Sequence, residues 1–541
     1  MHRPATWILA AVVGLVVAVG TPQLGHGPGA TGIAGATAAA ATTRPNVLFV
    51  LTDDLDSAEL KYMPHTRALI GAEGATFDRY YVSNSLCCPS RTTTIRGQYA
   101  HNTGVWTNGG TNGGFERAYS TGIEQDTIAT RLHHAGYLTS LTGKYLNGYP
   151  NGAPPNYVPP GWSNWASAVF GNPYSEYRYV LNQNQQYKVY GRTPKDYGTN
   201  VYMGLTDQFI RHAAAEKKPF FAYLSVYAPH QPATPARQDR AKFASAEAPR
   251  TPSFDQADVS RMPKFIRDLP HFTPAETAAI DYLYRKRIRS LQAVDRGVVR
   301  LVETLRATKQ LDNTYIVFAS DNGFHLGQHR MPAGKQTAYE PDIHVPLMVR
   351  GPGVKAGTHL PQLAANIDLA PTFEAMAGVR SAPFTDGRSL LPLVHGARER
   401  RWRDAILVEH RNETGETPPG RPTTKHPSTL EPADPDQQPK LPIKPGREIR
   451  DQAFLARGAE IPDYDAVRTS RYLYVEYANG ERELYDTHND PDEIDNLAGL
   501  TPAQAGGTPT TTIERDLARQ IQELRECKAA GCRVADREPA A

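Results

Sequence analysis

Two apolar segments of the sequence each stop abruptly at a group of acidic and amide residues. Residues 46–51 (NVLFVL) and 314–320 (TYIVFAS) are short apolar runs, which predict strands buried on both faces of a parallel sheet. The residues that follow are Asp53 and Asp54 after the first run and Asp321 and Asn322 after the second. Ligands of open α/β sheets bind beyond the carboxyl ends of the strands. We therefore expect these polar side chains to meet at one edge of a sheet.

Other apolar runs predict further strands with polar residues at their ends. Residues 137–142 lead into Lys144, and residues 220–227 lead into His230. Residues 345–349 form another buried strand in this interpretation. A lysine or histidine at a strand end is usually solvated surface. The shared edge with two acidic strand ends makes Lys144 and His230 candidates for a functional site.

The segments between the predicted strands favour helices. Apolar residues recur at helical spacing in 124–135 and in 273–308. The second segment begins with Thr273, a proline and Glu276, which is the order of a capping box. Strands that alternate with helices predict an α/β fold, with a large, mainly parallel sheet flanked by helices.

The two acidic strand ends favour a metal site. Adjacent carboxylates repel each other unless a positive charge lies between them, and carboxylate and amide oxygens suit a hard cation. Taken alone, Asp53 and Asp54 could be a helix cap with a solvated neighbour. Asp321 and Asn322 favour the metal, and the lack of a histidine or cysteine ligand set argues against zinc. These residues suit calcium or magnesium, and they do not choose between the two ions.

Residues 87–97 (CCPSRTTTIRG) need a chemical explanation, because the chain has only 4 cysteines and little material for a disulfide framework. Pro89 and Ser90 suit the first turn of a helix. Cys87 would then lie at a helix N-terminus, which favours an anion, with Arg91 one turn away. The alternative is that Cys87 and Cys88 are buried apolar fillers.

This C-x-P-S-R pattern, followed by a helix of small residues and a glycine, resembles the signature of type I sulfatases. The resemblance implies an alkaline-phosphatase-like fold and oxidation of Cys87 to formylglycine (3-oxoalanine) by a formylglycine-generating enzyme. It also implies a calcium ion held by a formylglycine oxygen at position 87 and by the two acidic strand ends. The segments TDD, GKYLNGY, APHQP and DNGFHLGQH look most like N-acetylglucosamine-6-sulfatases.

The resemblance also implies roles for single residues. Lys144 and Lys335 would hold the sulfate oxygens, Arg91 would position the formylglycine diol, and His230 would protonate the departing alcohol. His325 is expected to contact the substrate, although a structural histidine is an equal alternative. The implied reaction releases sulfate from a sulfate monoester, on a sulfated sugar such as N-acetylglucosamine 6-sulfate or on an aryl sulfate.

One position departs from the family pattern. Many sulfatases have a histidine two residues after the first active-site lysine, and this chain has Leu146 there, followed by Asn147. The base of the elimination step is therefore not identified by the sequence.

The two ends of the chain differ in character from the middle. Residues 1–43 predict a secretory signal peptide and a low-complexity tether, with a retained membrane anchor as the alternative. A secreted, cell-surface or periplasmic protein without stable membrane insertion is expected. Residues 44–395 are the predicted catalytic domain. Residues 396–541 are a predicted C-terminal α+β subdomain with an antiparallel sheet and an exposed insertion at 412–450.

The C-terminal subdomain has its own local signals. Asn479 and Gly480 predict a hairpin turn between two strands, and residues 513–527 predict a closing helix. Cys527 and Cys532 could close a small disulfide loop in an oxidising compartment, or form a two-thiol metal clip.

The sequence also bears on the partners of the protein and on two alternative functions. The formal net charge of +3 gives no sign of a nucleic-acid partner, and the oligomeric state is open. A phosphate or phosphonate ester hydrolase of the same superfamily is the nearest rival. A secreted sulfoglycan-binding protein with an unmodified Cys87 is the rival from another class.

Overall fold

The computed structural model describes residues 44–398, 401–414 and 460–537, which belong to one compact unit. The predicted signal peptide and tether at 1–43 lie outside the described residues, as do residues 415–450 of the predicted insertion. The domain boundary at residue 395 stays a prediction. In the described part of the chain, no helix is both long and apolar enough to cross a bilayer.

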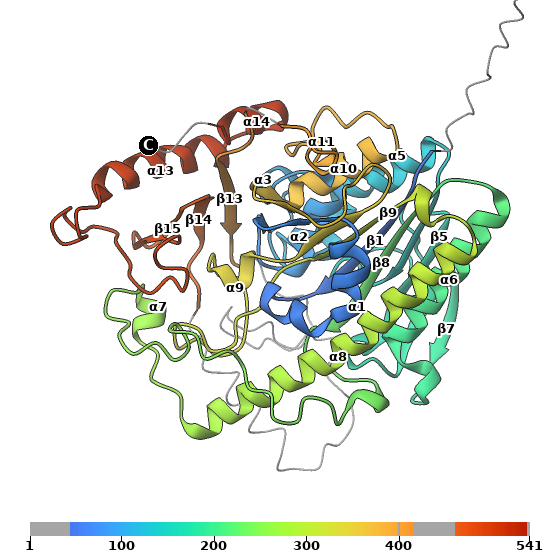
Figure 1. Ribbon diagram of the computed structural model, residues 1–541, viewed down its shortest axis with the longest axis horizontal. Coiled ribbons are helices and arrows are strands. Elements are labelled where there is room, and N and C mark those ends of the chain that lie inside the picture. The colour runs from blue at the N-terminus through green and yellow to red at the C-terminus, as the bar shows by residue number, and fades with distance from the viewer. Residues whose placement is uncertain (1–43, 399–400, 415–459, 538–541) are drawn as a thin grey trace, which may run out of the picture. The chain divides into compact units, whose positions relative to one another are not determined.

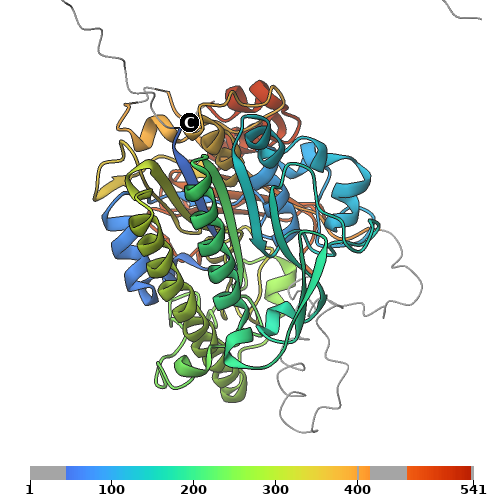
Figure 2. The ribbon, with the colours of Figure 1, turned by 90° about the vertical axis from the view of Figure 1, so that its right-hand side faces the viewer.

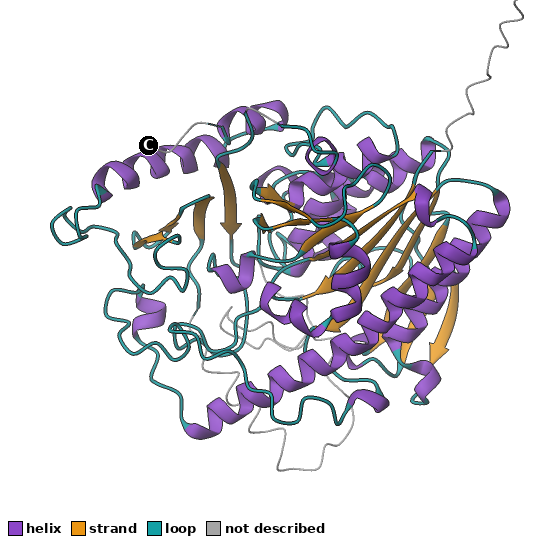
Figure 3. Cartoon of the chain, viewed as in Figure 1, coloured by secondary structure: helices purple, strands orange, loops and turns teal. Residues whose placement is uncertain are grey.

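A large mixed sheet forms the centre of the described unit (Figure 3). Its strands are β1 (Asn46–Asp53), β2 (Ala75–Phe77), β4 (Leu138–Gly143), β5 (Asn164–Gly171), β6 (Tyr179–Gln183), β7 (Gln186–Tyr190), β8 (Phe220–Pro229), β9 (Thr314–Ser320), β10 (Leu347–Arg350) and β11 (Thr358–Leu360). Their order is β11-β2-β10-β9-β1-β8-β4-β5-β6-β7. The central strands β9, β1, β8, β4 and β5 are parallel, and β10, β6 and β7 pair antiparallel with their neighbours.

Helices cover both faces of this sheet (Figure 1). The longer ones are α2 (Cys87–Arg96), α5 (Ile128–His134), α6 (Gly198–Glu216), α8 (Pro274–Ala307) and α10 (Leu369–Met376). Val47 and Phe49 of β1 pack in one core with side chains of α2, α5 and α10, whereas Leu48 and Val50 face α6 and α8. This alternation is the period of a strand. Figure 2 shows α6 and α8 packed side by side across the second face.

Short elements complete this part of the unit. The shorter helices are α1 (Pro64–Thr66), α3 (Ala100–Thr103), α4 (Gly114–Ser120), α7 (Lys264–Arg267), α9 (Glu340–Ile343) and α11 (Leu391–Val394). A separate parallel pair joins β3 (Tyr80–Tyr81) to β12 (Ala364–Ala365).

The predicted α/β fold is confirmed, with one local error. The predicted strands correspond to β1, β4, β8, β9 and β10, and the capping box at the start of α8 is present, with the amide of Thr273 donating to Glu276 Oε2 at 2.7 Å. The predicted continuous helix at 124–135 is wrong. A 3-10 helix (Ile123–Gln125) ends first, and Thr127 is the extended N-cap residue of α5, with its amide donating to Thr130 Oγ1 at 2.9 Å. Polar side chains that bond to the local backbone favour such helix starts over helix interiors.

A second, antiparallel sheet contains the C-terminal strands. They are β13 (Ala405–His410), β14 (Tyr464–Thr469), β15 (Tyr472–Tyr477) and β16 (Arg482–Asp486), in that order. The predicted hairpin joins β15 to β16, and Gly480 has the left-handed φ of 88° that the turn needs. The helix α13 (Thr510–Arg525) covers this sheet with its buried Ile513, Leu517 and Ile521.

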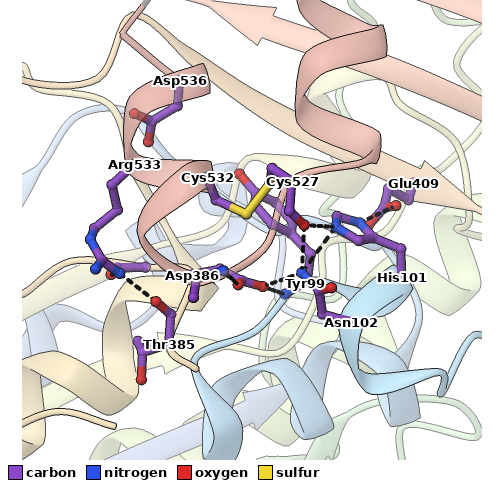
Figure 4. The surroundings of a disulfide bond; sticks show 12 residues. Tyr99, His101, Asn102, Thr385, Asp386, Glu409, Cys527, Cys532, Arg533 and Asp536 are labelled. Atoms are coloured by element: carbon purple, nitrogen blue, oxygen red, sulfur yellow. Dashed lines mark hydrogen bonds and ion pairs between the residues drawn. A yellow bond between two sulfur atoms is a disulfide. The ribbon is translucent and has the colours of Figure 1, made fainter. Parts of the chain in front are cut away.

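The chain after α13 is closed by a disulfide between Cys527 and Cys532, which lies just before α14 (Cys532–Ala535). The alternative of a two-thiol metal clip is therefore wrong. The carbonyl of Cys527 accepts from Asn102 Nδ2 at 2.9 Å and lies next to the ring of His101 (Figure 4). Cys87 and Cys88 are free thiols and are buried.

Arg403 joins the C-terminal residues to the main sheet's helical layer through a fully buried ionic network. Its Nη2 donates to Asp368 Oδ1 at 2.8 Å and its Nε to Asp536 Oδ2 at 3.0 Å. Removing one partner of such a network leaves uncompensated charge in the interior.

We predict that Arg403→Met lowers the free energy of unfolding by about 3–5 kcal/mol. The control is Arg515→Met, whose side chain is 72% exposed beside Asp516, and it should cost under about 1 kcal/mol. Urea denaturation followed by circular dichroism compares the two variants. Equal midpoints for both would show that the buried network does not support the C-terminal contact.

Candidate active site at the carboxyl edge of the sheet

The register of the parallel strands brings the polar strand ends together. Thr52 of β1 is paired with Ser320 of β9, and Gly143 of β4 is paired with Ser225 of β8. Strands β1 and β8 are themselves adjacent and parallel. The residues just beyond these positions are Asp53, Asp54, Lys144, His230, Asp321 and Asn322. These side chains therefore lie together at one edge of the sheet, as the sequence predicts.

Cys87 is the first residue of α2, and it points at this edge. Its Sγ lies 3.3 Å from Asp53 Oδ1 and 3.9 Å from Asp54 Oδ1. Lys335 Nζ lies 2.8 Å from the same sulfur atom. The residue is fully buried, at the positive end of the helix dipole. An acidic pair, a lysine and a helix N-terminus therefore surround one thiol.

Two buried lysines neutralise the two carboxylates. Lys144 Nζ donates to Asp53 Oδ2 at 2.8 Å, and Lys335 Nζ donates to Asp54 Oδ1 at 2.7 Å. Burial alone would lower the pKa of Lys144, but the Asp53 carboxylate raises it well above its ordinary value. Burial would likewise raise the pKa of Asp53, and Lys144, His230 and Arg91 together hold it below its usual range. Both partners are therefore charged at neutral pH.

Arg91, which lies in α2 like Cys87, binds the carboxylate of Asp321. Its Nε donates to Asp321 Oδ2 at 2.7 Å, and its Nη1 donates to Ser225 Oγ and, at 3.3 Å, to the carbonyl of Lys144. The other carboxylate oxygen of Asp321 accepts the amides of Asp54 and Asn322 at 3.1 and 2.8 Å. Burial raises the pKa of Asp321 to about 6, and Arg91 only partly offsets that rise.

The donor atoms at this edge fit a hard cation. Ligand atoms of Asp53, Asp54, Cys87 and His230 all lie within 4.8 Å of one another. Asn322 Nδ2 donates to Asp54 Oδ1 at 2.7 Å, while its Oδ1 is buried and accepts no hydrogen bond from the described residues. A buried carbonyl oxygen without a donor is costly. A hard cation beside the carboxylates would coordinate this Asn322 oxygen.

His230 has a defined orientation next to the lysine. Its Nδ1 lies 2.6 Å from the carbonyl of Gln231, so Nδ1 carries a proton, because a carbonyl only accepts. Its Nε2 faces Asp54 Oδ2 at 3.6 Å. The ring of Tyr174 lies 4.6 Å from the His230 ring and 4.9 Å from Lys144 Nζ.

Two further residues singled out in the sequence, His325 and Leu146, have no contact with Cys87 or the acidic pair among the hydrogen bonds described above. His325 is fully buried, its Nδ1 lies 2.9 Å from Asp342 Oδ1, and its backbone pairs with Gly334, next to Lys335. A substrate contact of His325 stays a prediction. Leu146 is buried in the hydrophobic core, so it does not replace the histidine that many sulfatases have there.

Several residues of the site were missed by sequence reasoning. Ser225 holds Arg91 from inside a strand, and Tyr174 lies beneath the lysine and histidine. Asp54 has a left-handed φ of 67°, and Arg287 of α8 donates to its carbonyl while pairing with Glu59 at 2.7 Å. The alternation of side chains along β8 could have placed Ser225 on the face of the sheet that α2 covers, where Arg91 lies. No local signal marks Tyr174 or Arg287.

Comparison with known proteins identifies the family and agrees with the fold. The family model described as Sulfatase matches residues 45–379. Human N-acetylglucosamine-6-sulfatase is 34% identical over 510 residues, which covers 92% of this chain and 87% of the relative. The extracellular sulfatase SULF-1 homolog of Drosophila melanogaster is 37% identical over 383 residues, which covers 69% of this chain and 34% of that protein.

A solved structure shares the architecture over most of its length. It is described as a complex with its substrate D-glucosamine-2-N,6-O-disulfate, and it matches with a TM-score of 0.67 and 21% identity, covering 89% of this chain and 98% of that one. The fold is that of the alkaline-phosphatase-like sulfatases. The chain belongs to the sulfatase family. It is a sulfuric ester hydrolase.

The position of Lys144 depends on Gly143. Gly143 has a φ of 107°, and a Cβ there would lie 1.8 Å from the carbonyl oxygen of Ser225. Any side chain would push β4 away from β8 and move the lysine that follows. Gly136 has a similar φ of 87° with nothing within 4 Å of its added Cβ.

We predict that Gly143→Ala destabilises the protein far more than Gly136→Ala, which should cost only about 1–2 kcal/mol of backbone strain. Thermal unfolding of the two variants measures the difference. Because both glycines have left-handed conformations, equal melting temperatures would mean that the close approach of β8 places no constraint on Lys144.

Proposed function

We propose that the protein hydrolyses sulfate monoesters of sugars, with N-acetylglucosamine 6-sulfate as the substrate type, through formylglycine made from Cys87 and a bound calcium ion. The observation that carries this proposal is the position of Cys87. Its sulfur lies at a helix N-terminus, within 3.9 Å of Asp53 and Asp54 and 2.8 Å from Lys335. A thiol that only filled the core would have apolar neighbours.

The neighbouring cysteine supports the choice of Cys87. Cys88 is equally buried, but it belongs to the hydrophobic core, and burial raises the pKa of its thiol to about 12. Such a thiol is chemically inert at neutral pH. Formylglycine at position 87 would supply, in its hydrated form, one hydroxyl as the nucleophile and a second hydroxyl whose loss of a proton would expel sulfate and restore the aldehyde.

The donor set favours a hard cation, and the resemblance to sulfatases selects calcium in this proposal. Asp53, Asp54 and Asn322 offer oxygen atoms near position 87, and Asp321 lies beside them in contact with Arg91. These are the ligands of hard cations, with magnesium as the other member of the class. The ion would supply positive charge close to the oxygens of the transferred sulfate.

The chain's own residues supply the other functions. Lys144 and Lys335 are buried ammonium groups on either side of the acidic pair, and they can neutralise sulfate oxygens without solvent screening. Arg91 fixes the first turn of α2 relative to β8 and β9. His230 donates its Nδ1 proton to a carbonyl, so Nε2 is the nitrogen that can give a proton to the leaving alcohol oxygen, which requires the imidazolium form with a proton on both nitrogens.

The choice of substrate type follows two relatives. Human N-acetylglucosamine-6-sulfatase matches 92% of the chain, and the solved neighbour is described with a glucosamine disulfate as its substrate. Aryl sulfates serve as simple assay substrates of the same bond type. Secretion, with removal of residues 1–43 and prior action of a formylglycine-generating enzyme, completes the proposal and agrees with the Drosophila relative's description as extracellular.

We predict that Cys87→Ala abolishes sulfate release from p-nitrophenyl sulfate and that Cys88→Ala keeps turnover within a few-fold of the wild type. The two substitutions remove the same atoms from adjacent positions, so general loss of packing is controlled. Mass spectrometry of the peptide that contains residue 87 should show an aldehyde in the active protein. Retained turnover in Cys87→Ala would refute the proposed nucleophile.

A parallel assay separates the rival hydrolases. The enzyme should prefer p-nitrophenyl sulfate to p-nitrophenyl phosphate and to a phosphonate monoester, as judged by kcat/KM. Preference for a phosphorus ester would assign the rival function. Binding of sulfated sugar without turnover, together with an unmodified Cys87, would assign a binding protein.

We predict that calcium raises the melting temperature of the protein and that Asn322→Leu removes most of this effect. Loss of groups around a metal already costs about 10–100-fold in affinity, and a direct ligand should cost no less. Asn313→Leu, at the opposite end of β9, is the matched control. An unchanged calcium response in Asn322→Leu would exclude the amide as a ligand.

A further inference from the structure

A cavity of about 800 Å³ lies away from the candidate active site and is lined by arginines. It is formed by Pro371 of α10, by residues 380–389 and by the C-terminal segment after the disulfide. The arginines that line it are Arg131, Arg380, Arg388 and Arg533. None of the residues around Cys87 lines it. Its volume is in the range of sites for small ligands, about 300–1,000 Å³.

The helix α2 joins this cavity to the active site. Cys87 begins the helix, and Gly97 ends it in a left-handed conformation with a φ of 71°. A Cβ at Gly97 would lie 3.0 Å from Thr385 and 3.2 Å from Pro371, which both line the cavity. A helix of 10 residues is about 15 Å long. The cavity is therefore separate from the reacting centre.

Arg388 is the unusual residue of the cavity. Its side chain is only 8% exposed. Its Nη2 donates to Asp536 Oδ1 and, at 3.2 Å, to the carbonyl of Arg533. Its Nε and Nη1 are buried and donate no hydrogen bond to the described residues. Buried guanidinium nitrogens without acceptors are rare and costly.

Arg388 shares its nearest carboxylates with a second buried arginine, Arg403. Burial lowers the pKa of Arg388, and the neighbouring Arg403 lowers it further, while Asp536 and Asp368 only partly offset both effects. Asp536 is itself shared with Arg403, at 3.0 Å from its Nε. An added anion in the cavity would stabilise the charged form of Arg388.

The other arginines differ in how far they are already paired. Arg131 is paired with Asp126 at 2.7 Å, and Arg533 Nη1 donates to the carbonyls of Thr385 and Gly387. Carbonyls do not neutralise its charge. Arg380 is exposed at the same cavity. The cavity therefore has more positive than negative groups.

The disulfide loop holds Arg533 in place. Figure 4 shows Arg533 just beyond Cys532, with its guanidinium against Thr385. On the other side of the loop, the amide of Ala529 donates to Asp386 Oδ1 at 2.6 Å, and Asp386 also accepts from Asn102 at 2.9 Å. The cavity wall is thus assembled by contacts between segments that are remote in sequence.

We propose that this cavity binds the sulfate group of a sulfated saccharide, at a site distinct from the one that cleaves the ester. Guanidinium groups match tetrahedral oxyanions with paired N–H donors. The volume far exceeds that of a single ion, and Pro371, Ala382 and Pro383 add apolar surface on which a sugar ring can lie. The ligand class follows the proposed function, whereas the cavity itself does not depend on Cys87 chemistry.

The test measures binding in the full chain with Cys87→Ala, so that turnover does not interfere. Isothermal titration uses a 6-O-sulfated N-acetylglucosamine hexasaccharide in one arm and sodium sulfate in the other. Arg380→Gln and Arg388→Lys should each weaken binding of the hexasaccharide by roughly tenfold. Arg388→Lys keeps a cation beside Asp536. Arg380→Gln alters an exposed side chain, so at least this variant should fold.

Arg306→Gln on α8, across the sheet from the cavity, is the control and should bind normally. In the active enzyme, Arg380→Gln should raise KM for the hexasaccharide and leave kcat/KM for p-nitrophenyl sulfate within twofold. Tight binding of sodium sulfate alone would reassign the cavity to the free product ion and overturn the saccharide. Equal affinities in Arg380→Gln, Arg388→Lys and Arg306→Gln would overturn the site altogether.

Discussion

Two adjacent carboxylates, buried at the end of the central strand, set the conditions for the rest of the structure. Asp53 and Asp54 are at most 1% exposed, and a buried carboxylate without a partner costs several kcal/mol. Lys144 and Lys335 supply the opposite charges, at 2.8 and 2.7 Å. The acidic pair is stable only when β4 and the segment between β9 and α9 have brought these lysines to the same edge.

The same requirement explains why the site is closely tied to the sheet order. The strands β8 and β9 flank β1, β4 flanks β8, and each ends in a residue that touches the acidic pair or its partners. Arg91 and Arg287 then fix the arrangement from helices on opposite faces of the sheet. A substitution that shifts one strand by a residue would separate charges that are costly to leave alone.

Sequence reasoning placed the strands and their polar ends because both are local signals. A buried apolar run followed by two carboxylates is visible within residues 46–54, and the parallel topology follows from the alternation with helices. Ser225, Tyr174 and Arg287 were missed, because their roles depend on which segments become neighbours in three dimensions. The break before α5 was missed because the Thr130 hydroxyl accepts from the Thr127 amide, a local bond that apolar spacing does not report. The arginine-lined cavity could not be predicted, since its members come from segments that are hundreds of residues apart.

The burial of Cys87 has a consequence for the order of events during synthesis. The lysine that covers its sulfur lies 248 residues further along the chain. At about 5–20 residues per second, that lysine leaves the ribosome roughly 10–50 s after the cysteine. Until then the residues that surround the thiol are not all synthesised, and in the folded protein Cys87 is 0% exposed. An enzyme that modifies this thiol therefore has to reach it during those seconds of translation, before the folded protein buries the sulfur atom.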